Sequence, residues 1–246
     1  MKVDFGGIEW NSYVHTKWDS SRYDNAYFGP EGVREVVNPS YYRLYIERSP
    51  KYFTKPYNYP TSNTDESTCK EWCCGELIGQ ACSYGTFTWR VKMPEYPHVW
   101  PALWLCGVKT WPPEIDLVEG YTEDEDNYYR GLFCRTTLET NFHKRIGFEN
   151  GTHTSLGASG IWGIIYKWLH KDIDEYKIVW TPKYVKLYFN GFRIRKMTDK
   201  EMLADLNEDH SMNPIMNMMV DNGFELDDRH LPYMSVYSFE YIPMKR

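Results

Sequence analysis

The sequence lacks the basic clusters and long apolar runs that mark proteins bound to nucleic acid or embedded in membranes. Its 28 lysines and arginines are outnumbered by 34 aspartates and glutamates, and the formal net charge is −6 at pH 7. Non-specific binding to nucleic acid needs clustered cations that neutralise phosphates, so we expect no nucleic-acid partner. No apolar run approaches the roughly 20 residues of a transmembrane helix, so we expect no membrane partner either.

Signal-peptide and multidomain features are also missing. The N-terminal segment MKVDFGGIEW has no apolar core of about 7–15 residues. We expect a secreted or cell-envelope protein whose signal peptide is absent from this chain, with an intracellular protein as the alternative. The sequence has no internal repeat, low-complexity tract or interdomain linker, so we predict a single domain over residues 1–246, acting as a monomer.

The cysteines do not have the spacing of a metal site. Four of the six lie in the segment TCKEWCCGELIGQACS, whose C-x3-C-C-x7-C spacing lacks the paired C-x2-C units of zinc sites. Free thiols, or a loop staple in a secreted form, are the expected states, and no particular disulfide is predicted. We expect no metal and no other cofactor. The six are Cys69, Cys73, Cys74, Cys82, Cys106 and Cys134.

Aromatic residues are abundant, with 21 Tyr, 10 Trp and 11 Phe in 246 residues. A core of this size needs fewer, so some rings are expected to face solvent or a ligand. Tyr and Trp combine a flat apolar face with a polar group, which suits the apolar C–H faces and hydroxyl rims of sugars. Core packing is the alternative for any single ring.

Alternating hydrophobic patterns predict many strands. The segment YKIVWTPKYVKLYFNGFRIRKM, Tyr176 to Met197, alternates apolar and polar residues around Asn190-Gly191, the preferred pair of a two-residue hairpin turn. Further strands are predicted in YYRLYIE, YGTFTWRVKM, WPALWLCGV, EIDLVEGY, NPIMNMMVDNG and YMSVYSFEYI. One short helix is predicted in TDKEMLADL, where Thr198 and Glu201 have the spacing of a capping box.

Many strands, one short helix and frequent Gly, Pro and Asn turns indicate an all-β protein. We predict a jelly-roll β-sandwich of two antiparallel sheets. A long loop is expected to follow the strand YYRLYIE up to about Thr68, and KWLHK near Trp168 is expected to form a single turn.

The segment WPPEIDLVEGY places three carboxylates, Glu114, Asp116 and Glu119, in a strand that otherwise reads as buried. In a regular strand Glu114 and Asp116 share one face and Glu119 points into the core, which is costly for a charge. A β-bulge between Asp116 and Glu119 restores the parity and places all three on one face. A solvated edge strand and a calcium site are the alternatives, but the apolar and tryptophan neighbours disfavour the first, and calcium loops are richer in Asn, Asp and Gly.

With one residue absorbed by the bulge, the Cα atoms of Glu114 and Glu119 lie roughly 13 Å apart. On a concave sheet, two long side chains can lean together to about 5–5.5 Å, the separation of a retaining glycosidase. One carboxylate then attacks the sugar and the other protonates the leaving oxygen. Asp116, between them, can share a proton and raise the pKa of the acid.

The segment YGTFTWRVKMPEYPHVWPALWLCGVKTWPPEIDLVE resembles the centre of glycoside hydrolase family 16, which shows a YG-x-F/Y strand, a K-M-P turn, W-P-A-F-W and E-[ILV]-D-x-x-E. Downstream, DIDEYKIVWTPKYVKLYFNG is similar to the family's D-F-H-x-Y stretch, and the last two predicted strands also resemble its own. The resemblance runs in order from about Tyr42 to the C-terminus.

The resemblance implies a concave substrate cleft and an endo-acting, retaining hydrolysis of a β-linked polysaccharide by double displacement. It implies that Glu114 is the nucleophile, Asp116 the assisting carboxylate and Glu119 the acid/base. Two residues between Asp116 and Glu119 mark the bulged branch, with laminarinases, agarases, porphyranases and carrageenases, and argue against the unbulged lichenases and plant xyloglucan transglycosylases.

The expected substrate-binding residues follow from the same comparison. The rings of Trp100 and Trp104 match positions that stack on sugar, and Trp111 is a weaker candidate; core packing is the alternative for each. Tyr121 and Asn217 are candidate polar groups of the cleft.

Arg130 and Cys134 stand near the positions where the family often has histidines, which weakens a laminarinase assignment. Tyr237 replaces the Asp that commonly belongs to a structural calcium site, so no calcium is assumed.

The substrate is open between an algal galactan (porphyran, agarose or carrageenan) and a β-1,3-glucan. If Arg130, Arg135, Lys144 and Arg145 faced the cleft they could hold sulfate esters; a solvated loop is the alternative. Two other functions remain open: a lectin-like binding sandwich, which has no use for a full carboxylate trio, and a transglycosylase of the same family.

Overall fold

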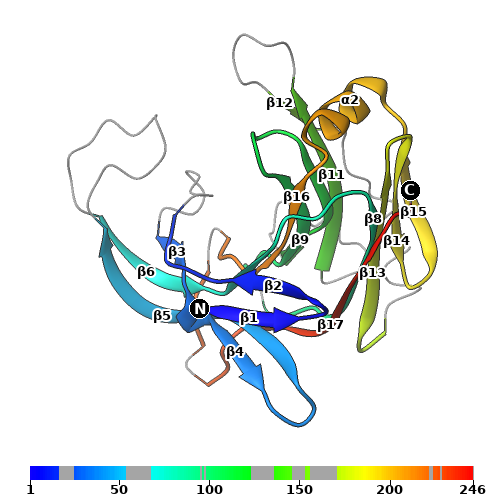
Figure 1. Ribbon diagram of the computed structural model, residues 1–246. Helices are drawn as coiled ribbons and strands as arrows, with labels where there is room; N and C mark the ends of the chain where they lie inside the picture. Colours follow the sequence, from blue (N-terminus) through cyan, green and yellow to red (C-terminus); the bar gives the residue numbers. More distant parts are fainter. Residues whose placement is uncertain are drawn as a thin grey trace.

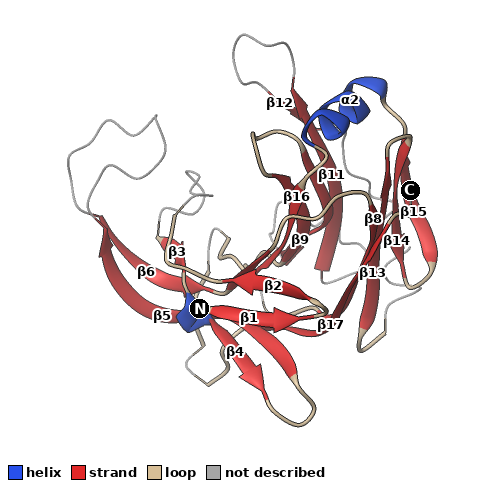
Figure 2. Cartoon of the chain, in the orientation of Figure 1, coloured by secondary structure: helices blue, strands red, loops and turns tan. Residues whose placement is uncertain are grey.

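The structure is a computed structural model and consists almost entirely of strands in two sheets (Figure 1, Figure 2). It describes residues 1–16, 25–53, 68–94, 96, 98–122, 136–145, 153–155, 171–221, 224–227 and 229–245. The two sheets stack face to face, and all strand pairs but one are antiparallel, the exception being β3 with β6. The predicted jelly-roll sandwich is therefore confirmed.

The first sheet carries the three carboxylates. Its order is β1 (Lys2–Phe5), β2 (Ile8–Asn11), β7 (Glu76–Gly79), β16 (Met212–Asn217), β9 (Ala102–Gly107), β10 (Glu114–Thr122), β11 (Thr136–Arg145) and β12 (His153–Ser155).

The second sheet lies behind the first. Its order is β15 (Phe192–Met197), β14 (Tyr184–Phe189), β13 (Asp174–Thr181), β8 (Gly85–Lys92), β17 (Tyr233–Pro243), β5 (Tyr41–Phe53), β6 (Thr68–Cys74) and β3 (Ala26–Phe28), while β4 (Val33–Val36) pairs with β5. Two short helices complete the described chain, the 3-10 helix η1 (Pro30–Gly32) and the α-helix α2 (Lys200–Asp209).

The alternation in the sequence sets which face of each strand is buried. On β13, Tyr176, Ile178 and Trp180 are fully buried, and Phe87 and Trp89 on the neighbouring β8 face the same core. Each such side chain contributes about 1.5–3 kcal/mol when it leaves water, so a shift of one residue in register would be very costly. The core between the sheets therefore fixes which face of the first sheet is left for function.

The hairpin of β14 and β15 has the predicted turn. Phe189 pairs with Phe192, and Asn190 and Gly191 both have positive φ angles, 45° and 81°. Asn and Gly adopt this conformation more easily than other residues, which is why this dipeptide marked the turn in the sequence.

Two details of the fold differ from the sequence-based expectation. The strand predicted for YYRLYIE continues as β5 to Phe53, so the first part of the expected long loop is extended. Residues 54–67 and the first four residues of the segment KWLHK, 167–170, lie outside the described residues. Tyr237 stacks on Tyr41 with ring centroids 4.6 Å apart.

The second difference is the start of α2. Its N-cap is Asp199, whose carboxylate accepts a hydrogen bond from the Met202 amide at 2.8 Å. Thr198 precedes the cap, and Glu201 pairs with Lys144 on β11 instead of closing a capping box. The predicted capping box was wrong because Asp199 also has an ion pair with Lys144, at 3.2 Å, which favours the cap one residue later.

The structure describes five cysteines and places none of them in a disulfide: Cys69, Cys73, Cys74, Cys82 and Cys106. Cys134 lies outside the described residues. Burial raises the pKa of Cys73 and of Cys82 to about 11, so both thiols stay protonated at neutral pH. Within the described chain, no helix is long and apolar enough to cross a membrane.

The position of the cap can be tested with two substitutions. Asp199→Ala removes both the N-cap hydrogen bond and one partner of Lys144, so we expect the free energy of unfolding in denaturant to fall by about 1–2 kcal/mol. Thr198→Ala should change it by less than about 0.5 kcal/mol. A larger loss for Thr198→Ala than for Asp199→Ala would restore the capping box at Thr198.

Candidate active site

The bulge that the sequence required lies in β10. Asp116 pairs with Asn141 and Glu119 with Glu139, so three steps along β10 match two along β11. A shift also separates Asp116 from Val118 in the pairing with β9. Leu117 and Val118, which are consecutive, are both fully buried, whereas Glu119 is half-buried and turned back toward the carboxylate face.

The free energy gained by burying apolar side chains exceeds the free energy of the hydrogen bond that the bulge disrupts. The bulge disrupts one hydrogen bond of the ladder, worth about 1 kcal/mol net, and in exchange both Leu117 and Val118 reach the core. An additional buried apolar side chain contributes about 2 kcal/mol. The bulge also avoids placing the charge of Glu119 between the sheets. Local packing therefore brings the three carboxylates to one face.

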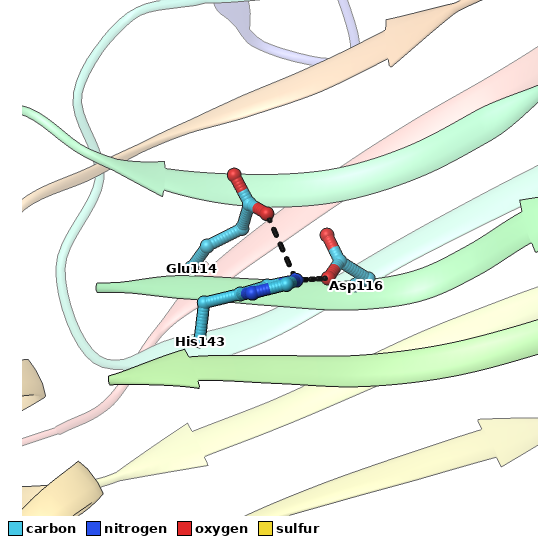
Figure 3. Close-up of side chains that lie close together, drawn as sticks. All are labelled: Glu114, Asp116 and His143. Atoms are coloured by element: carbon cyan, nitrogen blue, oxygen red, sulfur yellow. Dashed lines mark ion pairs between the residues drawn. The ribbon is translucent and has the colours of Figure 1, made fainter. Parts of the chain in front are cut away.

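His143 lies between two of the carboxylates, a contact that the sequence-based analysis missed. Its Nε2 atom is 3.3 Å from Oε1 of Glu114 and 3.1 Å from Oδ2 of Asp116 (Figure 3). His143 is directly opposite Glu114 in the pairing of β10 with β11. The sequence analysis placed Arg130 and Cys134 near the positions of the family's histidines; both lie earlier in the chain than His143 and outside the described residues. The alternation of Asn141 and His143 around buried Phe142 was the signal in the sequence that could have found it.

The third carboxylate has its own partner on β11. The side-chain amide of Asn141 donates a hydrogen bond of 2.5 Å to Oε2 of Glu119. This bond orients one oxygen of Glu119 and leaves the other for a different contact. Two residues on the same face of β11 therefore contact all three carboxylates. His143 contacts Glu114 and Asp116, and Asn141 contacts Glu119.

Trp111 contacts the first carboxylate from the loop before β10. Its indole Nε1 donates a hydrogen bond of 2.9 Å to Oε2 of Glu114, and its ring centroid is 6.2 Å from that of His143. The ring is 43% exposed, so a large apolar face beside Glu114 is open to solvent. Such a face can stack on a sugar ring.

The loop that carries Trp111 is anchored by Arg145, at the end of β11. Its side chain donates hydrogen bonds to Oγ1 of Thr110 and, at 3.4 Å, to the carbonyl of Pro112. Its backbone amide donates to Asp205 of α2, and its guanidinium pairs with Glu208. The helix, the strand and the loop are therefore joined at this residue.

Trp104 and Asn217 lie together on the same sheet face as the carboxylates. The Nε1 atom of Trp104 donates a hydrogen bond of 2.7 Å to Oδ1 of Asn217. Trp104 is paired with Asp116 across β9 and β10. It belongs to a small apolar cluster separate from the core, made of Ala102, Trp104, Cys106 and Ile215 with Ile78 beside it. This cluster forms an apolar floor next to the carboxylates.

The other expected binding residues are placed differently. Trp100 is partly buried against the main core between the sheets, the arrangement expected of a packing residue. The backbone of Tyr121 pairs with Thr137 in β10 and β11, but its side chain lies outside the described part. Arg130 also lies outside it.

Burial dominates the electrostatics of the site. It raises the pKa of Glu114 well above its usual range, and the neighbouring charge of Asp116 raises it further, while His143 and the hydrogen bond from Trp111 lower it. The pKa of Asp116 is also well above its usual range, mainly through burial and then through Glu119, against which the charge of Arg195 acts. Carboxyl groups with such shifts are typical of catalytic sites.

One set of side chains in the site has the composition of a metal site. Ligand atoms of Glu114, Asp116 and His143 all lie within 4.8 Å of one another. Two carboxylates and an imidazole can hold a divalent transition metal. Nε2 of His143 is within ion-pair distance of both carboxylates, and Oδ2 of Asp116 is a buried oxygen without a hydrogen-bond partner among the described residues.

The fold and the site define a β-sandwich with a glycosidase-like set of carboxylates on one open sheet face. Residues 54–224, well over half of the chain, match the model of "Glycosyl hydrolases family 16". The chain therefore belongs to glycoside hydrolase family 16, and it is a glycoside hydrolase by class. The suspected resemblance is confirmed.

Comparisons with individual proteins agree with this family. Over 117 residues, 47% of this chain, it is 32% identical to the endo-1,3-1,4-β-glycanase EglC of Rhizobium meliloti. A second R. meliloti endo-1,3-1,4-β-glycanase, ExsH, is 28% identical over the same length. The match spans about a fifth of each of these relatives, 21% of their length.

Solved structures support the fold over almost the whole chain. A Bacteroides ovatus family 16 protein from a mixed-linkage glucan locus, in complex with a G4G4G3G product, has a TM-score of 0.65 at 15% identity and covers 98% of this chain and 99% of its own. The laminarinase catalytic domain of Thermotoga maritima has a TM-score of 0.62 at 18% identity and covers 96% and 92%.

The raised pKa values make a prediction about stability. A carboxyl group whose pKa is raised in the folded state stabilises the fold below its unfolded pKa, and this contribution is lost as pH rises through the folded pKa. Asn at position 116 cannot ionise, so in Asp116→Asn the stability no longer falls as the pH rises through the pKa of this group. We expect its melting temperature to exceed that of the wild type by about 2–4 °C at pH 7.5 and by clearly less at pH 4.5, as measured by calorimetry.

Asp172→Asn is the control for this experiment. Asp172 is exposed and pairs with Lys92 at the surface, so its substitution should give no gain that grows with pH. Equal destabilisation of Asp116→Asn at both pH values would contradict the raised pKa of Asp116.

Proposed function

We propose that this chain is an endo-acting, retaining β-glycanase that cleaves a neutral β-linked glucan by double displacement. The observation that carries the proposal is the bulge in β10, which turns Glu114 and Glu119 to one face on either side of Asp116. The names of the similar proteins, endo-1,3-1,4-β-glycanases and a laminarinase, support a β-glucan as the substrate.

In the first step, a carboxylate oxygen of Glu114 attacks the anomeric carbon, and Glu119 gives its proton to the departing glycosidic oxygen. A covalent glycosyl ester on Glu114 results, and the leaving chain departs as an alcohol. In the second step, Glu119 takes a proton from water, which attacks the same carbon and frees Glu114. Asn141 holds Glu119 in a fixed orientation in both steps, through its hydrogen bond to Oε2.

Asp116 and His143 act on the nucleophile. When Glu114 becomes an ester it loses its charge, so the contact of His143 with Glu114 weakens. The contact of Nε2 with Asp116, at 3.1 Å, then remains. The pair thus accommodates the change of charge without moving a loop. Trp111, which donates a hydrogen bond to the other oxygen of Glu114, fixes the direction of attack.

The charges near the site support a neutral substrate over a sulfated galactan. Lys144 and Arg145 were the described candidates for holding sulfate, but Lys144 is held by Asp199 and Glu201, and Arg145 by Glu208. On the described parts of β7, β16, β9, β10 and β11, the remaining charged groups besides His143 are carboxylates, Glu76, Glu114, Asp116 and Glu119 among them. A polyanion would be repelled here.

A lectin-like role is disfavoured by the same site. A binding protein has no use for buried carboxylates whose pKa values are raised and which cost stability. Transglycosylation uses the same intermediate with a sugar acceptor in place of water, and product analysis separates it from hydrolysis.

The substrate and the role of Glu114 can be tested in one panel. The wild type should release oligosaccharides from β-1,3-glucan or mixed-linkage β-glucan and none from porphyran or carrageenan, with mass spectrometry as the measurement. Glu114→Gln should lower kcat by at least about 10³-fold and leave the fold and polymer binding intact. Glu240→Gln, at an exposed position of β17, is the control and should be fully active.

Two outcomes of this panel decide between the alternatives. Activity of Glu114→Gln close to the wild type would reject the nucleophile, and with it the proposed mechanism. Products longer than the starting chains would reveal a transglycosylase.

The role of Glu119 as acid/base makes a separate prediction. Activated aryl glycosides need little protonation of the leaving group. Glu119→Ala should therefore lose about 10²–10⁴-fold on the natural polymer and far less on a dinitrophenyl glycoside of the same glucan. Equal losses on both substrates, compared as kcat/KM, would argue against an acid role.

A further inference from the structure

Arg195 connects the second sheet to the strand that holds the catalytic carboxylates. It lies on β15, at the edge of the second sheet, whereas β11 belongs to the first sheet (Figure 1). Its Nη1 atom donates hydrogen bonds to the carbonyl oxygen of Thr140, at 2.5 Å, and to Oγ1 of the same residue, at 3.0 Å. The guanidinium carbon is 4.8 Å from the centre of the Phe142 ring.

Thr140, the residue of β11 that Arg195 contacts, is adjacent to the two residues of β11 that lie against Glu119. Thr140 lies between Glu139, which pairs with Glu119, and Asn141, which donates to the carboxylate of Glu119. In the described chain, β12 pairs with β11 only from His143 to Arg145. At Thr140, which is outside this described pairing, Arg195 donates two hydrogen bonds.

The charge of Arg195 also reaches the site. Burial lowers the pKa of Arg195, and the negative charge of Asp116 raises it again. In the other direction, Arg195 lowers the pKa of Asp116. A half-buried guanidinium is costly to desolvate, and packing over Phe142 alone would be served better by an apolar side chain.

The charged groups that influence Asp116 in the described chain come from three strands. Glu114 and Glu119 belong to its own strand, His143 to β11 and Arg195 to β15. On the β9 side its partner is Trp104, which is uncharged. Arg195 is the member of this set whose positive charge does not depend on pH in the working range.

We propose that Arg195 is a positioning residue of the active site, which fixes β11 behind Asn141 and His143 through its hydrogen bonds to Thr140 and places its positive charge in the interior of the sandwich, next to that strand. This inference rests on the proposed function, because it assumes that the trio is catalytic. Arg195 does not touch the sugar. It acts through Thr140 on the geometry of the site and through Asp116 on its charge.

Two substitutions separate these two actions. Arg195→Gln keeps a hydrogen-bond donor and removes the charge. Asp116 then holds its proton to higher pH, so the acidic limb of the pH profile of kcat/KM should move up by about one pH unit. Arg195→Lys keeps the charge and loses the planar group that reaches both oxygens of Thr140. Its acidic limb should stay within about 0.3 pH units of the wild type, while kcat falls several-fold.

Arg193 supplies the matched control, because it lies two residues earlier on β15 and is exposed. Arg193→Gln and Arg193→Lys should leave both the pH profile and kcat unchanged. Circular dichroism at each pH checks that the variants are folded. A variant that is unfolded at the assay temperature is assayed at a lower temperature, where the same shift of the acidic limb is expected.

The outcomes decide the inference. An acidic limb of Arg195→Gln that coincides with that of the wild type would overturn it, as would an equal shift in Arg193→Gln. If Glu114→Gln is inactive while Arg195→Gln has an unchanged profile, this inference alone fails. If Glu114→Gln is active, the proposed function fails first.

Discussion

The structure of this active site depends on one disruption of β-sheet pairing, the bulge between Asp116 and Glu119. Without it, Glu119 would point between the sheets, where an unpaired charge costs several kcal/mol. With it, two consecutive apolar residues, Leu117 and Val118, reach the core together. The hydrophobic effect, which is not itself directional, here sets the direction of the Glu119 side chain, because the burial of its neighbours leaves it no other face.

The concentration of negative charge in the site is balanced by groups on surrounding elements. Trp111 donates to Glu114 from the loop before β10, Asn141 donates to Glu119 from β11, and His143 lies between the first two carboxylates. The balance is incomplete, since the pKa values of Glu114 and Asp116 remain raised. Such a site is less stable than a neutral one would be, which is a common cost of a preorganised active site.

Much of the fold and half of the site could be predicted from the sequence. The alternation in Tyr176 to Met197 and the Asn190-Gly191 turn follow from local preferences that hold in any environment. The bulge was also predictable, because a burial argument over six residues, from Glu114 to Glu119, allowed one inexpensive solution.

The missed parts of the site depend on contacts between segments far apart in the sequence. Periodicity shows which face a residue occupies, but not which residue lies opposite it. The contact of His143 with Glu114 is set by the register of β11 on β10, and that of Arg195 with Thr140 by the packing of one sheet on the other. The start of α2 was missed for the same reason, since Lys144 of β11 favours Asp199 as the cap.

The attachment of α2 has a consequence for how the enzyme fails on heating. The helix is held to β11 by side chains at its surface, Asp199 and Glu201 on Lys144 and Glu208 on Arg145, and Arg145 in turn holds the loop of Trp111. Exposed ion pairs and single helices open at lower free-energy cost than a packed sandwich. Fraying of α2 would release Trp111 from Glu114 while the sheets are still intact, so thermal inactivation would precede global melting and would reverse on cooling.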